Sequence, residues 1–144
     1  MVATTIEQSK NLLKLGLKPD TADVHYKYVL PGHSDKIHHV PEFGNPVDSL
    51  KWYNMGYTKS GKKPLTLEEY CVPAWSLSAL LDVMPKIYNV EYDLSLIKSE
   101  SVLYFAFDDC DKNIHIDVDG NTPIEAAYNM VCWLFENGYI KKED

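Results

Sequence analysis

Residues 122–138, TPIEAAYNMVCWLFENG, carry the clearest structural signals in this chain. Thr122 is a good N-cap residue, because its hydroxyl can accept a hydrogen bond from an otherwise unpaired amide of the first helical turn. Pro123 follows at the first helical position, where its missing N–H is not needed. Glu125 completes a capping box, and Gly138 can adopt the left-handed conformation that ends a helix. The stretch therefore predicts one helix with both ends marked.

The polar residues of this predicted helix form a single narrow stripe. They are Glu125, Asn129 and Glu136, and most of the positions between them are apolar. A helix with only one covered face has a much wider polar side. We therefore expect cover on most of the circumference, from a sheet and other helices or from a second copy of the chain. Trp133 would lie in the interior in the first case, and at the seam of a homodimer through the C-terminal helix in the second.

Length and composition are those of one ordinary globular domain. The chain has 144 residues, of which 45% are hydrophobic and 24% charged, so residues 1–144 are expected to form a single domain. The formal net charge is −7, from 14 basic and 21 acidic residues, and every basic residue is a lysine. Because bidentate recognition of bases and phosphates relies on arginine, this composition argues against specific nucleic-acid binding.

Cysteine usage and the N-terminus predict a cytoplasmic protein. Cys71, Cys110 and Cys132 are odd in number, and no two of them have the close spacing of metal ligands. No basic region followed by an apolar run is present at the N-terminus, so no signal peptide is expected. The last helix is too short and too interrupted to span a bilayer. These observations favour a reducing compartment and no membrane partner.

The remaining periodicity predicts an α+β fold. A helix is expected at 5–15, where Thr5 and Gln8 form a capping box, and another at 76–84, where leucines recur at helical spacing. A single helical turn is expected at 66–70. Alternating apolar residues predict strands at 22–30, 91–98, 102–108 and 114–119. The predicted architecture is an antiparallel sheet of about four strands with three helices, with the C-terminal helix packed on the sheet.

Residues 31–64 form a Gly- and Pro-rich segment. They hold 8 of the 15 glycine and proline residues of the chain. Loops and turns are therefore expected, with short strands near 36–40 and 50–53. A loop of this length inside a small domain usually has a function.

The same segment holds the candidate site residues. Trp52, Tyr53 and Tyr57 either form a recognition surface or pack as a satellite cluster against the sheet. His38 and His39 belong to a group of four histidines within fifteen residues, which raises the question of imidazole metal binding. Adjacent residues of a strand point to opposite faces, so these two histidines cannot serve one site from a regular strand. We expect no bound metal there.

Two further stretches are similar to a calcium-binding loop and to a catalytic cysteine–histidine pair, but neither meets the requirements of such a site. The sequence DVDGN at 117–121 is similar to the start of a calcium loop, but Thr122 stands where that loop requires glycine. Cys110 and His115 flank one predicted hairpin loop, but the neighbouring aspartates would raise the pKa of the thiol. No catalytic residue, metal ligand or cofactor is therefore predicted.

Three segments at the predicted helices carry a resemblance to known proteins. They are TIEQSKNLLKLGLKPDTAD at 5–23, VPAWSLSALLDVMP at 72–85 and GNTPIEAAYNMVCWLFENG at 120–138. Together they resemble small uncharacterised proteins of gut Bacteroidetes, often encoded in phage-like or other mobile regions. Because the matched positions are helix caps and core residues, the resemblance implies a shared fold and no particular site. It also implies a soluble intracellular protein, accessory to a mobile element.

The sequence leads to three hypotheses for function. The leading one is a non-enzymatic protein-interaction module, an accessory factor of a mobile element that binds another protein. The first alternative is a small hydrolase or metal-dependent enzyme that uses the histidine-bearing loop. The second alternative is an acidic inhibitor that mimics nucleic acid, because residues 73–144 hold 13 acidic residues and only 5 lysines.

Overall fold

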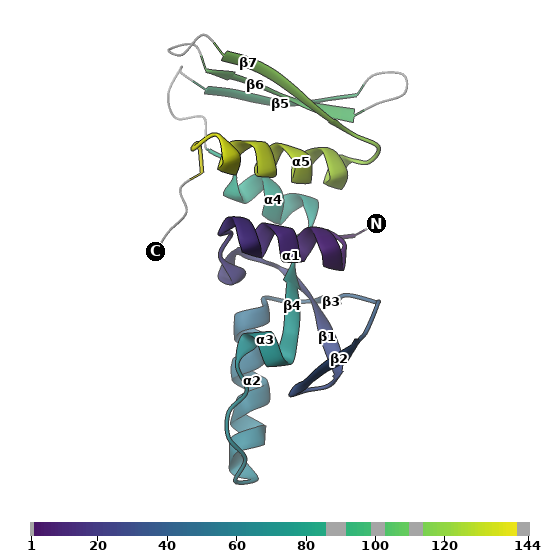
Figure 1. The fold of residues 1–144 in the computed structure, drawn as a ribbon, viewed down its shortest axis with the longest axis vertical. Helices are drawn as coiled ribbons and strands as arrows, with labels where there is room; N and C mark the ends of the chain where they lie inside the picture. The colour runs from purple at the N-terminus through teal and green to yellow at the C-terminus, as the bar shows by residue number, and fades with distance from the viewer. Residues whose placement is uncertain (1, 86–91, 99–102, 110–113, 141–144) are drawn as a thin grey trace. The chain divides into compact units, whose positions relative to one another are not determined.

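The computed structural model describes residues 2–85, 92–98, 103–109 and 114–140 (Figure 1). The chain groups into two compact units. Ala3–Ser76 form the first, called the N-terminal unit, and Leu77–Asp144 with Met1–Val2 form the second, called the C-terminal unit. The single domain expected from the length stays a prediction.

The N-terminal unit is a small sheet with helices around it. Its elements are α1 (Ile6–Leu15), the short 3-10 helix η1 (Pro19–Thr21), β1 (Val24–Leu30), β2 (His33–Ile37), β3 (Glu42–Phe43), α2 (Pro46–Lys59), α3 (Leu67–Tyr70) and β4 (Cys71–Ala74). The strand β1 is the central strand of the sheet, because it pairs antiparallel with each of the other three strands. Its first residues pair with both β3 and β4, and its last residues pair with β2.

The helix α1 begins and ends where the sequence predicts. The Thr5 amide donates to the Gln8 side chain at 3.0 Å, and the Gln8 amide donates to the Thr5 hydroxyl at 3.1 Å. These are the two hydrogen bonds of a capping box, and they pair two amides that the helix itself leaves unpaired. Gly16 ends the helix with a φ of 114°, a left-handed value that glycine adopts without strain.

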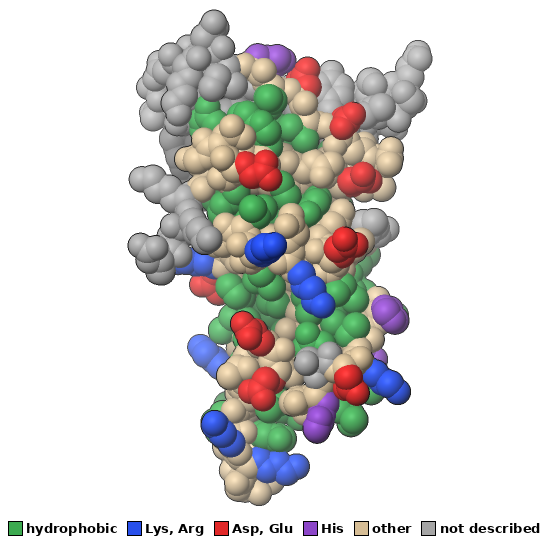
Figure 2. Space-filling model, in the orientation of Figure 1, with side chains coloured by type: hydrophobic (Ala, Val, Ile, Leu, Met, Phe, Trp, Pro, Cys, Tyr) green, Lys and Arg blue, Asp and Glu red, His purple; other side chains and the backbone are tan. Residues whose placement is uncertain are grey.

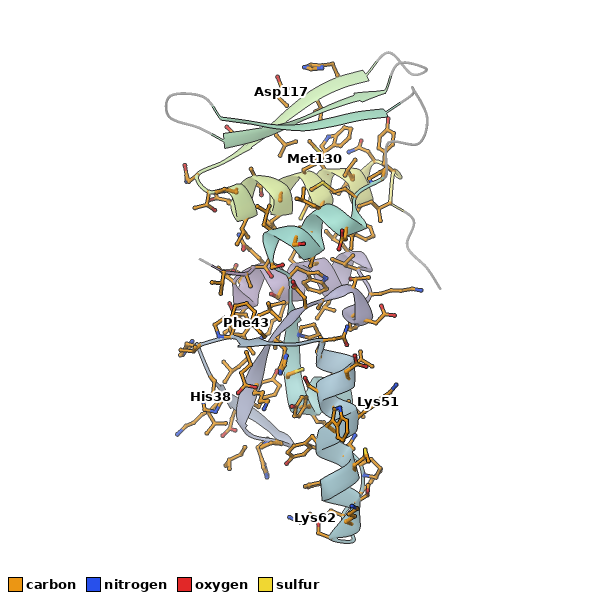
Figure 3. The ribbon with its side chains drawn as sticks, turned by 180° about the vertical axis from the view of Figure 1, so that it is seen from behind. His38, Phe43, Lys51, Lys62, Asp117 and Met130 are labelled. Carbon is orange, nitrogen blue, oxygen red and sulfur yellow. The ribbon has the colours of Figure 1, made fainter. Side chains whose placement is uncertain are left out.

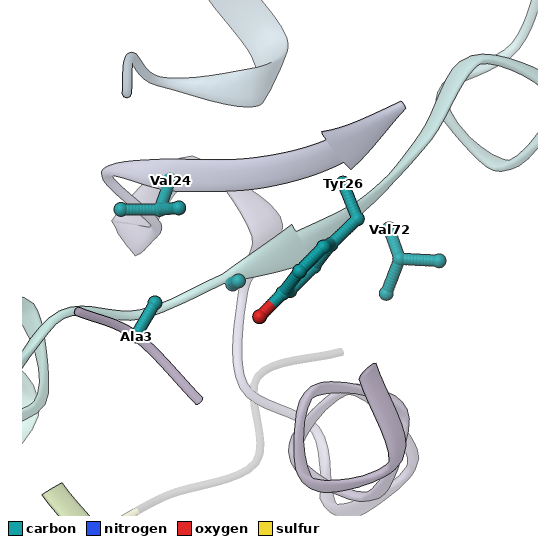
Figure 4. Packing of buried hydrophobic residues seen from close by; sticks show 5 residues of the cluster. Ala3, Val24, Tyr26 and Val72 are labelled. Atoms are coloured by element: carbon teal, nitrogen blue, oxygen red, sulfur yellow. The ribbon is translucent and has the colours of Figure 1, made fainter. Parts of the chain in front are cut away.

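Tyr26, Thr4 and Trp75 pair buried polar groups in the core of this unit. Val24, Tyr26 and Val72 pack with two alanines between β1, β4 and the N-terminal segment (Figure 4). The Tyr26 hydroxyl donates to the Thr4 carbonyl at 2.9 Å, and the Thr4 hydroxyl accepts the Trp75 amide at 3.1 Å. These bonds offset the cost of removing polar groups from water.

The segment 31–64 is not the long loop that its glycine and proline content predicts. It contains α2, a helix of 14 residues and so about four turns, in the place of the strand expected at 50–53. Asn45 caps α2, because its side-chain oxygen accepts the Val47 amide at 2.9 Å, and Pro46 occupies the first turn. The strand expected at 36–40 lies earlier in the chain, as β2.

The strand β4 was not predicted. Pro73 lies in its middle, and proline usually argues against a strand because it cannot donate to the ladder. Here it lies opposite His25 of β1, and all four residues of β4 are buried. Residues 71–74 therefore form a strand because they pair with β1, about fifty residues earlier in the chain.

The C-terminal unit confirms the α+β prediction and the packing of the last helix on a sheet. Its elements are α4 (Leu77–Val83), β5 (Tyr92–Lys98), β6 (Leu103–Asp109), β7 (Ile114–Gly120) and α5 (Pro123–Glu136). The strand β6 lies in the centre of an antiparallel sheet of three strands. The helix α5 contacts β6, β7 and α4, so the sheet and a second helix provide the cover that its narrow polar stripe requires.

The ends of α5 follow the sequence with one correction. The Thr122 hydroxyl accepts the Glu125 amide at 3.1 Å, but the Glu125 carboxylate accepts the Asn121 amide at 3.3 Å and does not close a capping box on Thr122. Gly138 ends the helix with a φ of 79°. Trp133 is half-buried and stacks on Tyr139 with 5.6 Å between ring centroids. A homodimer through this helix stays a prediction.

None of the helices in the described ranges combines the length and the apolarity needed to cross a bilayer.

Candidate interaction surface

Two of the three candidate aromatic residues form a row of rings along the inner side of α2. Tyr57 stacks on Tyr53 with 5.4 Å between centroids, and Tyr53 contacts Tyr70 of α3 at 5.2 Å. Tyr70 is buried and continues the row to His25 of β1 at 6.1 Å. Aromatic pairs at these distances stabilise packing. Tyr53 and Tyr57 are half-buried, so this row attaches α2 to the rest of the unit.

Trp52 behaves differently from its neighbour Tyr53. Its side chain is 73% exposed, and Met55, one turn further along α2, is 55% exposed. Residues three apart lie on the same side of a helix. The outer side of α2 therefore presents two large apolar side chains to solvent. Sequence reasoning identified Trp52 but missed Met55, although the spacing of three is visible in the sequence.

The far end of α2 is basic. Lys62 and Lys63, just after the helix, line a hollow of about 490 Å³ together with His33, Tyr57 and Glu69, among others. The Glu69 carboxylate is already engaged, because it accepts the Thr66 amide and the Thr66 hydroxyl, each at 3.0 Å. The backbone hydrogen bond from Thr66 lowers the pKa of Glu69. Figure 2 shows lysine side chains gathered at this end of the N-terminal unit.

The candidate histidines lie at a second, smaller hollow. His38 and His39 are exposed and line a space of about 250 Å³ together with Lys27, Val40 and Glu42. In Figure 3, His38 and Phe43 lie on the strand side of the unit, and Lys51 and Lys62 lie along α2 and beyond its end.

The four histidines of this region are not brought together. His33 lines the hollow near Lys62, and His25 is buried in β1. Within the described residues, no three His, Cys, Asp or Glu side chains are close enough to hold a metal ion.

A polar cluster that the sequence did not indicate lies beside the smaller hollow. His25 is 1% exposed; its Nδ1 is 3.0 Å from the Gly44 carbonyl oxygen, and its Nε2 is 3.7 Å from a carboxylate oxygen of Glu42. Lys27 Nζ is 2.9 Å from that same oxygen. The hydrogen bond between Lys27 and Glu42 lowers the pKa of the carboxyl and raises the pKa of the ammonium. The only signal in the sequence is that His25 and Lys27 share one face of a strand.

This cluster lacks an activated nucleophile. Burial raises the pKa of the nearby Cys71 thiol to about 12, so the thiol is protonated at neutral pH. Burial likewise raises the pKa of the Tyr70 hydroxyl. In the described part of the chain, His25 Nε2 has no hydrogen-bond partner, so it activates no neighbouring hydroxyl or thiol there.

The Lys27–Glu42 pair predicts a modest pH dependence of stability. Because folding lowers the pKa of Glu42, its contribution is present above the pKa of an unfolded glutamate, about 4.3, and is lost as the pH falls through the folded value. Folding raises the pKa of Lys27, so its contribution is lost only in alkali. Glu42→Gln should therefore lower the free energy of unfolding by about 0.2–1 kcal/mol near pH 7, as for other partly exposed pairs.

Urea unfolding at pH 7 and at pH 3 measures the difference in free energy of unfolding between the original protein and Glu42→Gln. It should vanish at pH 3, and a double-mutant cycle with Lys27→Met should assign most of it to the pair. A loss that is equally large at pH 3 would mean that Glu42 acts through packing alone.

Comparison with family models, with curated proteins and with solved structures yields no match to this chain.

Proposed function

We propose that this protein is a non-enzymatic protein-interaction module that binds a partner protein through the outer side of α2. The observation that carries the proposal is the exposure of Trp52 and Met55, 73% and 55%, one turn apart on one helix. Tryptophan is strongly enriched among the few residues that contribute most of the binding energy of protein interfaces. Methionine adapts its shape to different partners, so it is also common on such surfaces.

The arrangement of polar groups favours binding over catalysis. His38 and His39 are exposed at one hollow and His33 lies at another. Cys71 is buried with a thiol pKa of about 12. The hydrolase hypothesis requires a nucleophile and a base within hydrogen-bond reach of each other, and these residues do not supply such a pair.

The cellular setting is part of the same proposal. An accessory role for a mobile element follows from the resemblance of the three helical segments, and a cytoplasmic location follows from the cysteine usage. Both give the module an intracellular partner.

Site-specific photo-crosslinking tests the proposed surface. A photoreactive amino acid is placed at Trp52 or Met55 in the full chain, and at the exposed positions Lys10 and Lys14 of α1 as controls. The first two positions should yield the same crosslinked partner from a lysate of the native host, and the control positions should not. In the chain with the crosslinker at Met55, Trp52→Glu should reduce the yield by at least about tenfold, because a central tryptophan typically contributes 2 kcal/mol or more.

The same experiment can contradict the proposal. Equal labelling from α1 and α2 would show that the outer side of α2 is not a preferred surface. Crosslinking at Met55 that is unchanged by Trp52→Glu would show that Trp52 is not part of the contact.

A further inference from the structure

After Asp48, an exposed residue of the first turn that lies four residues before Trp52, α2 and the chain that follows it as far as residue 67 carry only positive charge. Residues 49–67 contain four lysines and no aspartate or glutamate, in a chain with a net charge of −7. Those lysines are Lys51, Lys59, Lys62 and Lys63, and all four are exposed. None of them makes an ion pair with another described residue. We call this set the lysine surface.

The exposed apolar pair lies among these lysines. Lys51 directly precedes Trp52, and Lys59 follows Met55 by one helical turn. From Lys51 to Lys59 the helix rises about 12 Å. Protein interfaces commonly have this composition, with a central apolar anchor and a polar rim that steers the partner and sets its orientation.

The lysine surface continues into the larger hollow. Lys62 and Lys63 line it, while Glu69, its one carboxylate, accepts two hydrogen bonds from Thr66. Lys62 Nζ lies 5.2 Å from the centroid of the Tyr57 ring, and the other contact of that ring is with Tyr53. The Tyr57 ring is thus already in contact with Lys62 and Tyr53. The Lys62 and Lys63 side chains, in contrast, are exposed and have no ion-pair partner among the described residues, so a carboxylate can approach them.

We infer that the partner contributes an acidic amphipathic segment, in which a large apolar side chain contacts Trp52 and Met55 and flanking carboxylates contact the lysine surface. The inference rests on the proposed function and adds the chemistry of the partner. An extended polyanion or an anionic membrane matches the surface less well. Each extends beyond the lysine surface and would meet the exposed acidic residues on either side of it in the sequence, Asp48 and Glu68, whereas a short segment can be confined to the lysines.

Purified full-length protein tests the inference against synthetic peptides. The probe is a fluorescent helical peptide in which glutamates flank leucine and phenylalanine, and its matched forms carry glutamine or lysine in place of every glutamate. The glutamate peptide should bind, and the other two should bind at least about tenfold more weakly. Raising the salt concentration should weaken the glutamate complex, because exposed charge pairs are screened.

Charge-neutralising variants locate the contact. Lys51→Gln with Lys59→Gln, and separately Lys62→Gln with Lys63→Gln, should each weaken binding of the glutamate peptide by about three- to tenfold. Lys10→Gln with Lys14→Gln makes the same change of net charge on α1, where both lysines are exposed, and should leave binding within about twofold.

Several outcomes would overturn the inference. They are equal binding of the glutamine peptide, an equal loss in the α1 control, and tighter binding of phosphatidylserine vesicles or single-stranded DNA than of the glutamate peptide. Salt-sensitive dimerisation of the protein alone that is lost in the lysine variants would show that the surface binds a second copy of this chain and not an acidic partner. Crosslinking at Met55 that depends on Trp52 but not on the lysines would overturn only this inference and leave the proposed function standing.

Discussion

Replacing Trp75 with alanine is expected to lower the free energy of unfolding by about 3–5 kcal/mol. Trp75 is 0% exposed and is the largest fully buried side chain among the described residues. Its indole N–H donates to the Thr21 hydroxyl at 2.9 Å, and its amide donates to the Thr4 hydroxyl at 3.1 Å. Alanine would leave a cavity and remove the donor to the Thr21 hydroxyl, which itself donates to the Lys18 carbonyl at 2.6 Å. Urea unfolding followed by circular dichroism measures the loss.

The same substitution at an exposed tryptophan provides the control. Trp52→Ala should change the free energy of unfolding by no more than about 0.5 kcal/mol, because the Trp52 side chain is 73% exposed. Trp75→Phe should lie between the two, since it retains much of the volume but loses the indole hydrogen bond. Similar losses for Trp75→Ala and Trp52→Ala would contradict the assignment of one to the core and the other to a binding surface.

Gly120→Ala is expected to have the next largest effect, at the upper end of about 1–3 kcal/mol or beyond it. Gly120 ends β7 just before α5, and its own φ is not in the left-handed region. A Cβ atom added there would lie 2.3 Å from the Ala126 nitrogen and 2.7 Å from the Glu125 carbonyl carbon. Both are backbone atoms of α5, so no side-chain rotation relieves the clash. The helix must shift away from the strand.

Gly56→Ala is the matched control for this prediction. Gly56 lies within α2, and a Cβ atom added there meets nothing within 4 Å. Alanine in a helix is favoured over glycine by about 0.5–1 kcal/mol, so this variant should be more stable than the original protein. The midpoint temperature of thermal unfolding should fall for Gly120→Ala and rise for Gly56→Ala. A Gly120→Ala variant as stable as the original would contradict the close approach of β7 to the start of α5.

Helices and strands whose signals lie within a short stretch of the chain were predictable from the sequence. The capping box of Thr5 and Gln8 and the left-handed Gly16 involve residues within one or two turns of each other, so α1 could be located from its own residues. The same holds for α5, with Thr122 at its start and Gly138 at its end. The alternation that predicted β5, β6 and β7 is likewise a property of short stretches.

The helix α2 was missed although its start signals were present. Asn45 and Pro46 are a good cap and a good first residue, but the density of glycine and proline over 31–64 outweighed them. Gly56 is tolerated inside the helix because the ring row of Tyr53 and Tyr57 attaches α2 to Tyr70. Packing of this kind can exceed the cost of one helical glycine.

The capped helices, the alternating strands and the all-lysine positive charge can be read from short stretches of the sequence. That Tyr53 faces inward while Trp52 faces solvent depends on the folded structure, since adjacent helical residues differ by about 100° and Tyr70 lies on another element. The structure likewise decided β4, and it set Glu42 opposite His25. Each of these features depends on contacts between residues far apart in the chain. Local sequence patterns cannot identify which distant residue makes the contact.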